Sequence, residues 1–256
     1  MNTPDLDINS DFSRFRPEEI DSLNRYVEQL DARVRGERGA SEVMATFPRY
    51  VRTMDLTRFL VTYEVFRKIT SVQGSIVELG VLHGFNIFSF AHLSEIFEHR
   101  NYVRRIYGFD TFDGYPTDFN PADRIEPDAS TSGWAATSLS EMTDSVAVFD
   151  TGRVFKQFEK ITLIQGDARD TIPQFVDDNP NLIVSLLVCN LDLYEATKVA
   201  IESFYPRMPR GSVILFGSTN TEWLPGETVA LQETLGIGAV QLERFPFATK
   251  WSFCVK

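Results

Sequence analysis

Apolar and polar positions follow two alternating rhythms along most of the chain. Short apolar runs predict buried strands, at 75–81, 104–110, 161–167, 182–192 and 211–217. Segments with helical spacing separate most of them, at 85–98, 169–178, 194–205 and 226–235. This alternation predicts an α/β fold with a Rossmann-like, doubly wound, mostly parallel sheet and helices on both faces. The pieces 239–246 and 251–256 predict a terminal strand pair, which makes the expected sheet seven-stranded.

The pattern before the first strand predicts helices only. Residues 17–35 show helical spacing, and Pro17 suits a first turn. The segment 56–70 is too apolar for a surface helix, so one broad face should be buried. We expect an N-terminal helical extension over 1–70 and a main domain over 71–256. The 17–35 helix suits formation of a homo-oligomer or a cover for the active site, and a solvated helix packed on the sheet explains it equally well.

One interval, 111–160, is far too long for an ordinary connection between strands. It is rich in Pro, Asp, Ser and Thr. Long insertions in compact domains often serve as lids or binding loops, and a surface excursion is the alternative. Trp134 and the helix-like stretch 138–150 are unlike a plain linker, so we expect a lid or substrate insertion here.

The composition limits the kinds of molecule that the protein is expected to bind. The net charge of −11 argues against nucleic acid as the main ligand, because phosphate binding needs a basic face. No apolar stretch is long enough to span a bilayer, and the first residues lack the apolar core of a signal peptide. Cys189 and Cys254 lie in apolar runs, which suggests buried free thiols and fits a reducing cytoplasm. We therefore expect a cytoplasmic protein that binds neither nucleic acid nor a membrane, and the charge says little about small-molecule ligands.

Acidic residues stand beside glycines at three predicted strand ends. The stretches are VELGVLHGFN (77–86), YGFDTFDGYP (107–116) and IQGDARDTIP (164–173). Gly80 allows a sharp turn and Gly84 allows backbone to approach a ligand closely. An acid at the second strand end can accept hydrogen bonds from ribose hydroxyls, and one at the third can accept from an adenine amino group. Taken singly, each is explained as well by a turn or a helix cap.

Together the three strand ends predict a nucleoside-shaped site without a pyrophosphate-binding loop. S-adenosylmethionine fits such a site, because it carries ribose and adenine and its cationic sulfonium tolerates nearby acids. The stretches above, together with NLDLYEATK, FYPRM and WLPGET, resemble the macrocin O-methyltransferase family over about residues 48–256. The resemblance implies a class I methyltransferase fold and S-adenosylmethionine-dependent methylation of sugar hydroxyls, often on natural products or surface glycans.

The resemblance also implies how the cofactor is held. It assigns cofactor contacts to Glu78, Gly80, Asp110 and Asp167, and places Asn86 near the methionine end. With the neighbouring turn residues, the full expected set is Glu78, Gly80, Gly84, Asn86, Asp110, Thr111, Gly166, Asp167, Ala168 and Asn190.

The chain departs from the family at the implied metal site. Members typically carry Asp-x-Asp-Leu-Tyr at the fourth strand and two acids at the end of the fifth. The first Asp of that motif and the acidic pair bind Mg²⁺, which holds and acidifies a sugar diol. Here Asn190 replaces the first Asp, and Gly217 and Ser218 replace the acidic pair. Because Mg²⁺ prefers carboxylate oxygens, we expect no tightly bound metal.

Without a metal, a side chain has to take the acceptor's proton. The candidate bases are Asp192, Glu195 and Asp113, with Glu227 and His83 as further candidates. Capping of the following helix explains Asp192 and Glu195 equally well.

Aromatic residues are the candidates for acceptor binding. Tyr115, Trp134, Tyr194 and Trp223 could form apolar platforms for a sugar ring, with packing of the lid as the alternative. The function predicted is methyl transfer from S-adenosylmethionine to a small polar acceptor such as a sugar. A degenerate cofactor-binding protein or partner subunit, and S-adenosylmethionine chemistry other than methyl transfer, are the alternatives.

Overall fold

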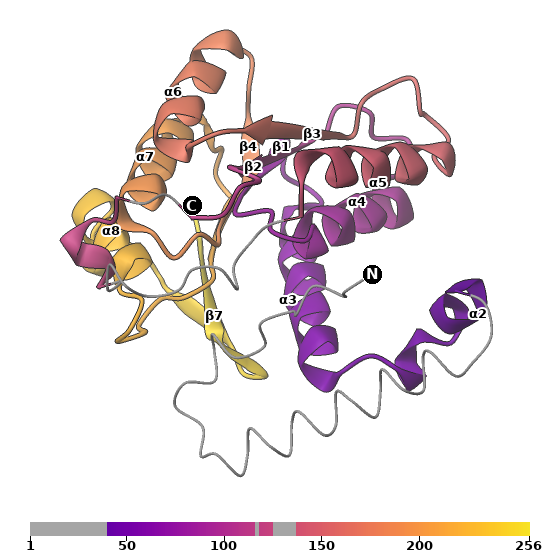
Figure 1. The fold of residues 1–256 in the computed structure, drawn as a ribbon. Coiled ribbons are helices and arrows are strands. Elements are labelled where there is room, and N and C mark those ends of the chain that lie inside the picture. The colour runs from indigo at the N-terminus through magenta and orange to yellow at the C-terminus, as the bar shows by residue number, and fades with distance from the viewer. Residues whose placement is uncertain (1–39, 116–117, 125–136) are drawn as a thin grey trace. The chain divides into compact units, whose positions relative to one another are not determined.

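The computed structural model describes residues 40–115, 118–124 and 137–256 (Figure 1). The chain divides into two compact units, residues 1–58 and 59–256. The helix predicted over 17–35 lies outside the described residues, as does Trp134.

The described part of the first unit contains short helices. They are α2 (Ala40–Ala45), the 3₁₀ helix η1 (Phe47–Arg49) and the first residues of α3 (Thr53–Ile69). Most of α3 belongs to the second unit, where its buried residues include Phe66 and Ile69. The burial expected for one face of this apolar helix is therefore confirmed.

The second unit is built on a seven-stranded sheet with the order β3-β2-β1-β4-β5-β7-β6. The strands are β1 (Ser75–Leu79), β2 (Ile106–Asp110), β3 (Ile161–Gln165), β4 (Val184–Cys189), β5 (Val213–Phe216), β6 (Glu243–Phe245) and β7 (Ala248–Val255). Strands β1 to β5 pair in parallel, whereas β7 pairs antiparallel with β5 and with β6. The predicted sheet is thus confirmed, including its terminal strand pair.

The helices follow the strands as the sequence predicts (Figure 1). They are α4 (Phe85–Glu98), α5 (Leu139–Thr151), α6 (Ala168–Asp178), α7 (Tyr194–Phe204) and α8 (Gly226–Thr234), with 3₁₀ turns η2 (Pro121–Asp123), η4 (Tyr205–Arg207) and η5 (Ile237–Ala239). None of the described helices has the length and apolar character that crossing a bilayer requires.

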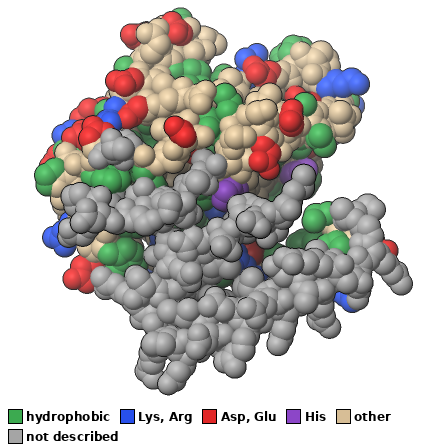
Figure 2. All heavy atoms as spheres, in the orientation of Figure 1, with side chains coloured by type: hydrophobic (Ala, Val, Ile, Leu, Met, Phe, Trp, Pro, Cys, Tyr) green, Lys and Arg blue, Asp and Glu red, His purple; other side chains and the backbone are tan. Residues whose placement is uncertain are grey.

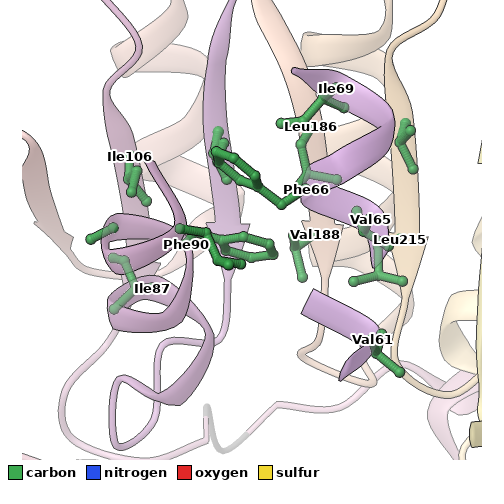
Figure 3. Packing of buried hydrophobic residues seen from close by; sticks show 14 of the residues in the cluster. Val61, Val65, Phe66, Ile69, Ile87, Phe90, Ile106, Leu186, Val188 and Leu215 are labelled. Carbon is green, nitrogen blue, oxygen red and sulfur yellow. The ribbon is translucent and has the colours of Figure 1, made fainter. Parts of the chain in front are cut away.

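Two hydrophobic cores cover the two faces of the sheet. Alternate residues of β4 divide between them, since Leu186 and Val188 join one core and Leu187 and Cys189 the other. Figure 3 shows the first core, in which Phe66 and other apolar residues of α3 and α4 meet the side chains of the strands. The helices α6, α7 and α8 supply the second core. Strands buried on both faces explain why the runs are apolar throughout rather than alternating.

The C-terminal part of the long 111–160 interval is an ordinary element of the fold. Parallel strands need a crossover connection, and α5 supplies it between β2 and β3. Met142 of α5 is buried in the first core, and Phe149 packs edge-on against His92, with ring centroids 5.0 Å apart. The excursion that remains as a candidate for substrate binding is 111–138.

Buried cations tie the amino ends of the strands together. The Lys160 ammonium, just before β3, donates to Ser94 Oγ, Asn101 O and Arg104 O at 2.9–3.0 Å. Burial lowers the pKa of Lys160 to about 8. Arg104, just before β2, is 3% exposed and donates to Glu98, Ser185 and several backbone carbonyls. Elsewhere, on the face that Figure 2 shows, the described acidic and basic side chains are interspersed.

Candidate active site

The predicted site residues follow the carboxyl ends of adjacent parallel strands. The order β3-β2-β1-β4-β5 places β1 and β4 side by side. After β1 the chain continues to β2 on one side of this pair, and after β4 it continues to β5 on the other side. Ligands of open α/β sheets bind at this switch point, beyond the carboxyl ends of the strands. The structure therefore brings the candidate residues of all five strands to one edge of the sheet.

The turn from β1 to α4 depends on two glycines with left-handed backbone. Gly80 has φ +83° and Gly84 has φ +78°. A Cβ on Gly80 would lie 2.4 Å from the carbonyl oxygen of Asn190, and one on Gly84 would lie 2.7 Å from Met142 Cε. Both distances are far below normal contact, so this turn packs directly against the end of β4 and against α5.

Glu78 and Asn86 form a buried pair behind this turn. Both side chains are fully buried, and Asn86 Nδ2 donates to Glu78 Oε1 at 2.8 Å. The bond fixes the first turn of α4 to the end of β1, and thus sets the position of the turn between them.

Asp110 organises the end of β2. Its Oδ2 accepts from the backbone N–H of Leu82 at 2.9 Å, and its Oδ1 accepts from that of Phe112 at 2.8 Å. Leu82 and Phe112 both have positive φ, a strained conformation for residues with side chains. The carboxylate is partly exposed and keeps free lone pairs, so it remains able to accept from a ligand.

The residues after Asp110 turn away from the sheet. Thr111 Oγ1 donates to the carbonyl of Gly114, and the N–H of Asp113 donates to Thr111 Oγ1 at 3.3 Å. The Asp113 side chain itself is exposed. Nearby, His83 Nδ1 lies 2.6 Å from Thr137 Oγ1, and His83 is also exposed.

Asp167 caps helix α6 and pairs with an arginine. It accepts from the N–H of Arg169 at 2.8 Å, and the Arg169 guanidinium bonds both Asp167 and Asp118. The hydrogen bond from Arg169 lowers the pKa of Asp167. Gly166 before it has φ +135°, and Ala168 after it is buried. The capping role considered from the sequence is present, and it ties this strand end to the described part of the insertion.

Asp192 stands in a strained and buried position after β4. Its φ is +60°, and the residue is 7% exposed. Its N–H donates to Glu227 Oε1 at 3.3 Å. Among the described residues, Asp192 Oδ1 has no hydrogen-bond partner.

Ser218 occupies the corresponding place after β5. It is fully buried, and its N–H donates to Glu227 Oε2 at 2.9 Å. Its hydroxyl has no partner within the described part of the chain. A Cβ on Gly217 would lie 2.5 Å from Asn190 Oδ1, so the Asn190 amide fills the space beside Gly217.

Glu227, at the start of α8, links the two strand ends. Its carboxyl oxygens accept one backbone N–H from Asp192 and one from Ser218. Glu227 is fully buried. Burial and then the charge of Asp192 raise the pKa of Glu227 above its ordinary value.

The segment 118–124 of the insertion docks onto helix α7. Asp123 Oδ1 accepts from the backbone N–H of Tyr194 at 2.6 Å, and Asn120 Nδ2 donates to Glu195 Oε1 at 2.7 Å. The N-cap of α7, Leu193, has no polar side chain, so Asp123 caps this helix from another part of the chain. The sequence reasoning missed this contact, although Asn120-Pro-Ala-Asp123 is a capping-box pattern that could have predicted η2.

The aromatic candidates lie in different places. The Tyr115 hydroxyl donates to the carbonyl of Leu191 at 3.1 Å, and removal from water followed by the charges of Asp192 and other acids raises its pKa. Tyr115 therefore lies close to Asp192. The Tyr194 hydroxyl instead bonds Lys198 of α7 and Glu233 of α8. Trp223 is 40% exposed in the loop after β5.

This arrangement can be compared with known proteins. The model of the macrocin O-methyltransferase (TylF) family matches residues 27–222. The chain belongs to the macrocin O-methyltransferase family. It is an S-adenosylmethionine-dependent methyltransferase with the class I fold. The comparison with curated protein sequences found no match.

Solved structures agree with the family. The chain is similar to CalS11, a calicheamicin methyltransferase, with 28% identity and a TM-score of 0.86 over 100% of this chain and 98% of that one. A second, apo structure of CalS11 is described as a TDP-rhamnose 3'-O-methyltransferase, and shows 25% identity and a TM-score of 0.79 over 96% and 97%. The O-methyltransferase NovP shares the fold, with 18% identity and a TM-score of 0.64 over 78% and 79%.

The metal position of the macrocin O-methyltransferase family does not suit Mg²⁺ in this chain. Asn190 offers an amide, Gly217 offers no side chain, and Ser218 offers a neutral hydroxyl. A further carboxyl beside Asp192 and Ser218, that of Glu227, already accepts two backbone N–H groups. Mg²⁺ prefers carboxylate oxygens in a nearly octahedral arrangement. Of this donor set, Asp192 alone supplies a carboxylate with an oxygen that has no partner among the described residues. Within the described ranges, no three His, Cys, Asp or Glu residues are grouped to hold a metal.

Proposed function

We propose that this chain methylates a hydroxyl group of a sugar, that Asp192 accepts the proton of that hydroxyl, and that no tightly bound metal takes part. Asp192 carries the proposal. It is buried, its backbone is strained, and one of its carboxylate oxygens has no partner within the described residues. Backbone strain and unpartnered buried polar atoms cost stability, and they concentrate where function requires them.

The acceptor class follows from the family and from one solved relative. Macrocin O-methyltransferases give the family its name, and CalS11, similar over nearly the whole chain, is described as acting on TDP-rhamnose. We therefore propose a small-molecule acceptor, either a nucleotide-linked deoxysugar or a sugar on a natural product.

The cofactor contacts are proposed at the carboxyl ends of β1, β2 and β3. The partly exposed Asp110 would accept hydrogen bonds from the ribose hydroxyls, since its carboxylate is oriented by two backbone N–H groups. The Glu78–Asn86 pair and Gly80 would shape the methionine end. Asp167 would lie beside the adenine, with its charge balanced by Arg169. The remaining expected contacts, Gly84, Thr111, Gly166, Ala168 and Asn190, belong to the same turns.

The bound cofactor would supply an electrophilic methyl group on a sulfonium sulfur. The acceptor oxygen would form its bond to the methyl carbon as the carbon–sulfur bond breaks, and the hydroxyl proton would pass to the Asp192 carboxylate. The products are the methyl ether, S-adenosylhomocysteine and one proton, which Asp192 releases to water.

The structure favours Asp192 over the other candidate bases. Glu195 accepts a hydrogen bond from Asn120, which directs one of its oxygens to the insertion. Asp113 is exposed on the turn after β2, where water would solvate its charge. Glu227 uses both oxygens on the backbone.

An assay with defined sugars tests the proposal. The full-length chain is incubated with S-adenosylmethionine and either TDP-rhamnose or other TDP-deoxysugars, and S-adenosylhomocysteine and the methylated sugar are measured by mass spectrometry. We expect a product that is one methyl group heavier, with equal release of S-adenosylhomocysteine. Tight cofactor binding without any release would indicate a protein that only binds the cofactor, and would contradict the proposal.

A further inference from the structure

We propose that Lys250 and Arg124 bind the diphosphate of a nucleotide-linked sugar beside the loop 217–225, and that Trp223 in this loop stacks on the nucleobase. The inference rests on the proposed function and deepens it, because it selects a nucleotide-linked sugar over a sugar on a natural product as the acceptor. Lys250 and Arg124 then bind the part of the acceptor that does not react.

The loop 217–225 connects β5 to α8 and is fixed at both sides. A hydrogen bond joins Thr219 Oγ1 to Ser252 Oγ of β7. The N–H of Asn220 donates to Thr228 Oγ1 of α8 at 2.9 Å. Because the loop is held by a strand and a helix, the side chains around it surround a defined surface at the carboxyl end of β5.

Lys250 supplies a cation at this end of the sheet. Strand β7 runs antiparallel to β5, and its Ser252 pairs with Phe216, the last residue of β5, so Lys250 lies beyond the carboxyl end of β5. Burial and then the charge of Asp192 raise the pKa of Glu227, whereas the charge of Lys250 lowers it. Lys250 is partly exposed. It is therefore close to the carboxyl that holds the proposed base, and a ligand can reach it.

Arg124 approaches the same loop from the insertion. It follows η2 and is exposed, and its Nη1 donates to the carbonyl oxygen of Glu222 at 3.5 Å. Trp223, the next residue of the loop, is 40% exposed. A guanidinium and an indole are thus neighbours on the loop that Lys250 borders from β7.

The chemistry of these three side chains sets the ligand. Lysine binds phosphate as a point charge, and arginine binds it through two parallel N–H groups. An aromatic face stacks on any nucleobase. A nucleoside diphosphate offers both the anion and the base, whereas a sugar on an uncharged natural product offers no anion.

The position of the cations fits an acceptor of this kind. Asp110 and Asp192 follow β2 and β4, on the part of the edge where the cationic cofactor is proposed, and Lys250 lies on β7 at the far side of β5. Strands β4 and β7 are two strand spacings apart, or about 10 Å. One sugar ring, the phosphate on its anomeric carbon and a hydrogen bond at each end span such a distance. The sugar hydroxyl can therefore reach Asp192 while the phosphate reaches Lys250.

Calorimetry with the nucleotide TDP tests the site without any turnover. TDP is titrated into the full-length protein saturated with S-adenosylhomocysteine, which carries no methyl group to transfer. We expect Lys250→Met to weaken binding by about 10- to 100-fold, the range of one hydrogen bond to a charged group. Lys250→Arg keeps the charge and should weaken it by less than about threefold. No binding of TDP by the wild type, or equal affinities of the wild type and Lys250→Met, would overturn the proposal.

Further variants separate the site from a general effect of charge. Arg124→Met should weaken TDP binding by about two- to fivefold, because water screens an exposed cation. Trp223→Ala should weaken it by about tenfold and Trp223→Phe by less than about threefold, since stacking needs an aromatic face. Lys156→Met removes an exposed lysine ahead of the amino end of β3, and should leave the affinity unchanged. A loss in Lys156→Met as large as that in Lys250→Met would overturn the proposal.

Rates on a charged and a neutral acceptor separate phosphate binding from a structural role of Lys250. Lys250→Met should lower kcat/KM on TDP-rhamnose by about 10- to 100-fold, and on methyl rhamnoside by less than about threefold. Equal losses on both acceptors would show that Lys250 only supports Glu227, and would overturn the proposal. If the wild type releases no S-adenosylhomocysteine with any sugar but binds TDP through Lys250, the proposed function fails and the binding site stands.

Discussion

Buried polar groups differ between the amino ends of the parallel strands, called here the amino edge, and their carboxyl ends, the carboxyl edge. At the amino ends of β2 and β3, the Lys160 ammonium donates to three oxygens, and Arg104 distributes its donors over Glu98, Ser185 and backbone carbonyls. At the carboxyl ends of β4 and β5, Asp192 and Ser218 each keep a buried oxygen without a partner among the described residues.

This difference indicates which part of the sheet lowers the stability of the fold. Satisfied buried charges hold strands and helices in place, and they leave nothing for a ligand to bind. The unpartnered oxygens of Asp192 and Ser218, the positive φ at Asp192 and the close Asp192–Glu227 pair lie at the carboxyl ends of β4 and β5. The amino edge therefore maintains the fold, and the carboxyl edge is arranged for binding and chemistry.

The largest effect on stability should come from breaking the amino edge at Arg104. Arg104→Ala removes the hydrogen bonds to Glu98 and Ser185 and leaves several carbonyls without donors. We expect the free energy of unfolding to fall by about 3–5 kcal/mol, measured by urea denaturation. Arg100→Ala, at an exposed position, is the control and should change it by less than about 0.5 kcal/mol. Equal small changes for both would contradict the assigned role of the amino edge.

A substitution at the carboxyl edge should lower activity without lowering stability. Asp192→Asn should lower kcat by about 10²–10⁴ through loss of the base, without lowering Tm, because it also removes the charge facing Glu227. Cofactor affinity, measured by calorimetry, should stay within about threefold. Comparable losses of kcat in Glu195→Gln or Asp113→Asn, with Asp192→Asn active, would move the base to those residues.

A smaller effect on stability is expected where the insertion caps α7. Asp123→Ala removes the acceptor for the Tyr194 N–H and should cost about 1–2 kcal/mol, as for other lost caps. Asp123→Asn keeps an acceptor oxygen and should recover most of this loss. If both variants unfold at the same denaturant concentration, the cap contributes nothing through its hydrogen bond.

The smallest expected effect is a dependence of the free energy of unfolding on pH, which arises from Glu227. Its carboxyl faces Asp192, Tyr115, Cys189 and Lys250. Its pKa is raised on folding, so folding takes up a proton and the group's contribution to stability falls as pH rises through the folded pKa. Glu227→Gln cannot titrate. The free energy of unfolding of the wild type minus that of the variant should thus decrease by more than about 1 kcal/mol between about pH 5 and pH 9. A constant difference would contradict the raised pKa.

The sequence predicted the fold well where burial alone decides structure. Strands β4 and β5 are buried at every residue, and their apolar runs made them easy to find. Both strands were predicted too long. Strand β4 ends at Cys189, and Asp192 beyond it has a left-handed backbone that no hydrophobic pattern encodes. Helix α5 was found, but its place as the β2–β3 crossover depends on strand order, which the local pattern does not contain.

The site was predictable only where the residues follow a strand directly. Asp110 ends β2, and that position made it a candidate for binding the cofactor, whereas Asp192 became a candidate base through its place after β4 together with the family resemblance. The contact of Asp123 with Tyr194 joins residues 71 apart in the chain, and Glu227 reaches back to Ser218 and Asp192 from α8. Such contacts arise from tertiary packing, so the unpartnered oxygen of Ser218 could not be recognised before the strands were assembled.

The most direct test compares initial rates of methyl transfer by the wild type in Mg²⁺ and in EDTA, with the same sugar acceptor and saturating S-adenosylmethionine. Our account predicts that kcat/KM in Mg²⁺ and in EDTA agrees within about twofold. The reason is that Asp192 takes the proton from the hydroxyl that a metal would otherwise acidify. A loss of about tenfold or more in EDTA, restored by adding Mg²⁺, would show that Asn190, Asp192 and Ser218 still hold a catalytic ion, and would contradict the account.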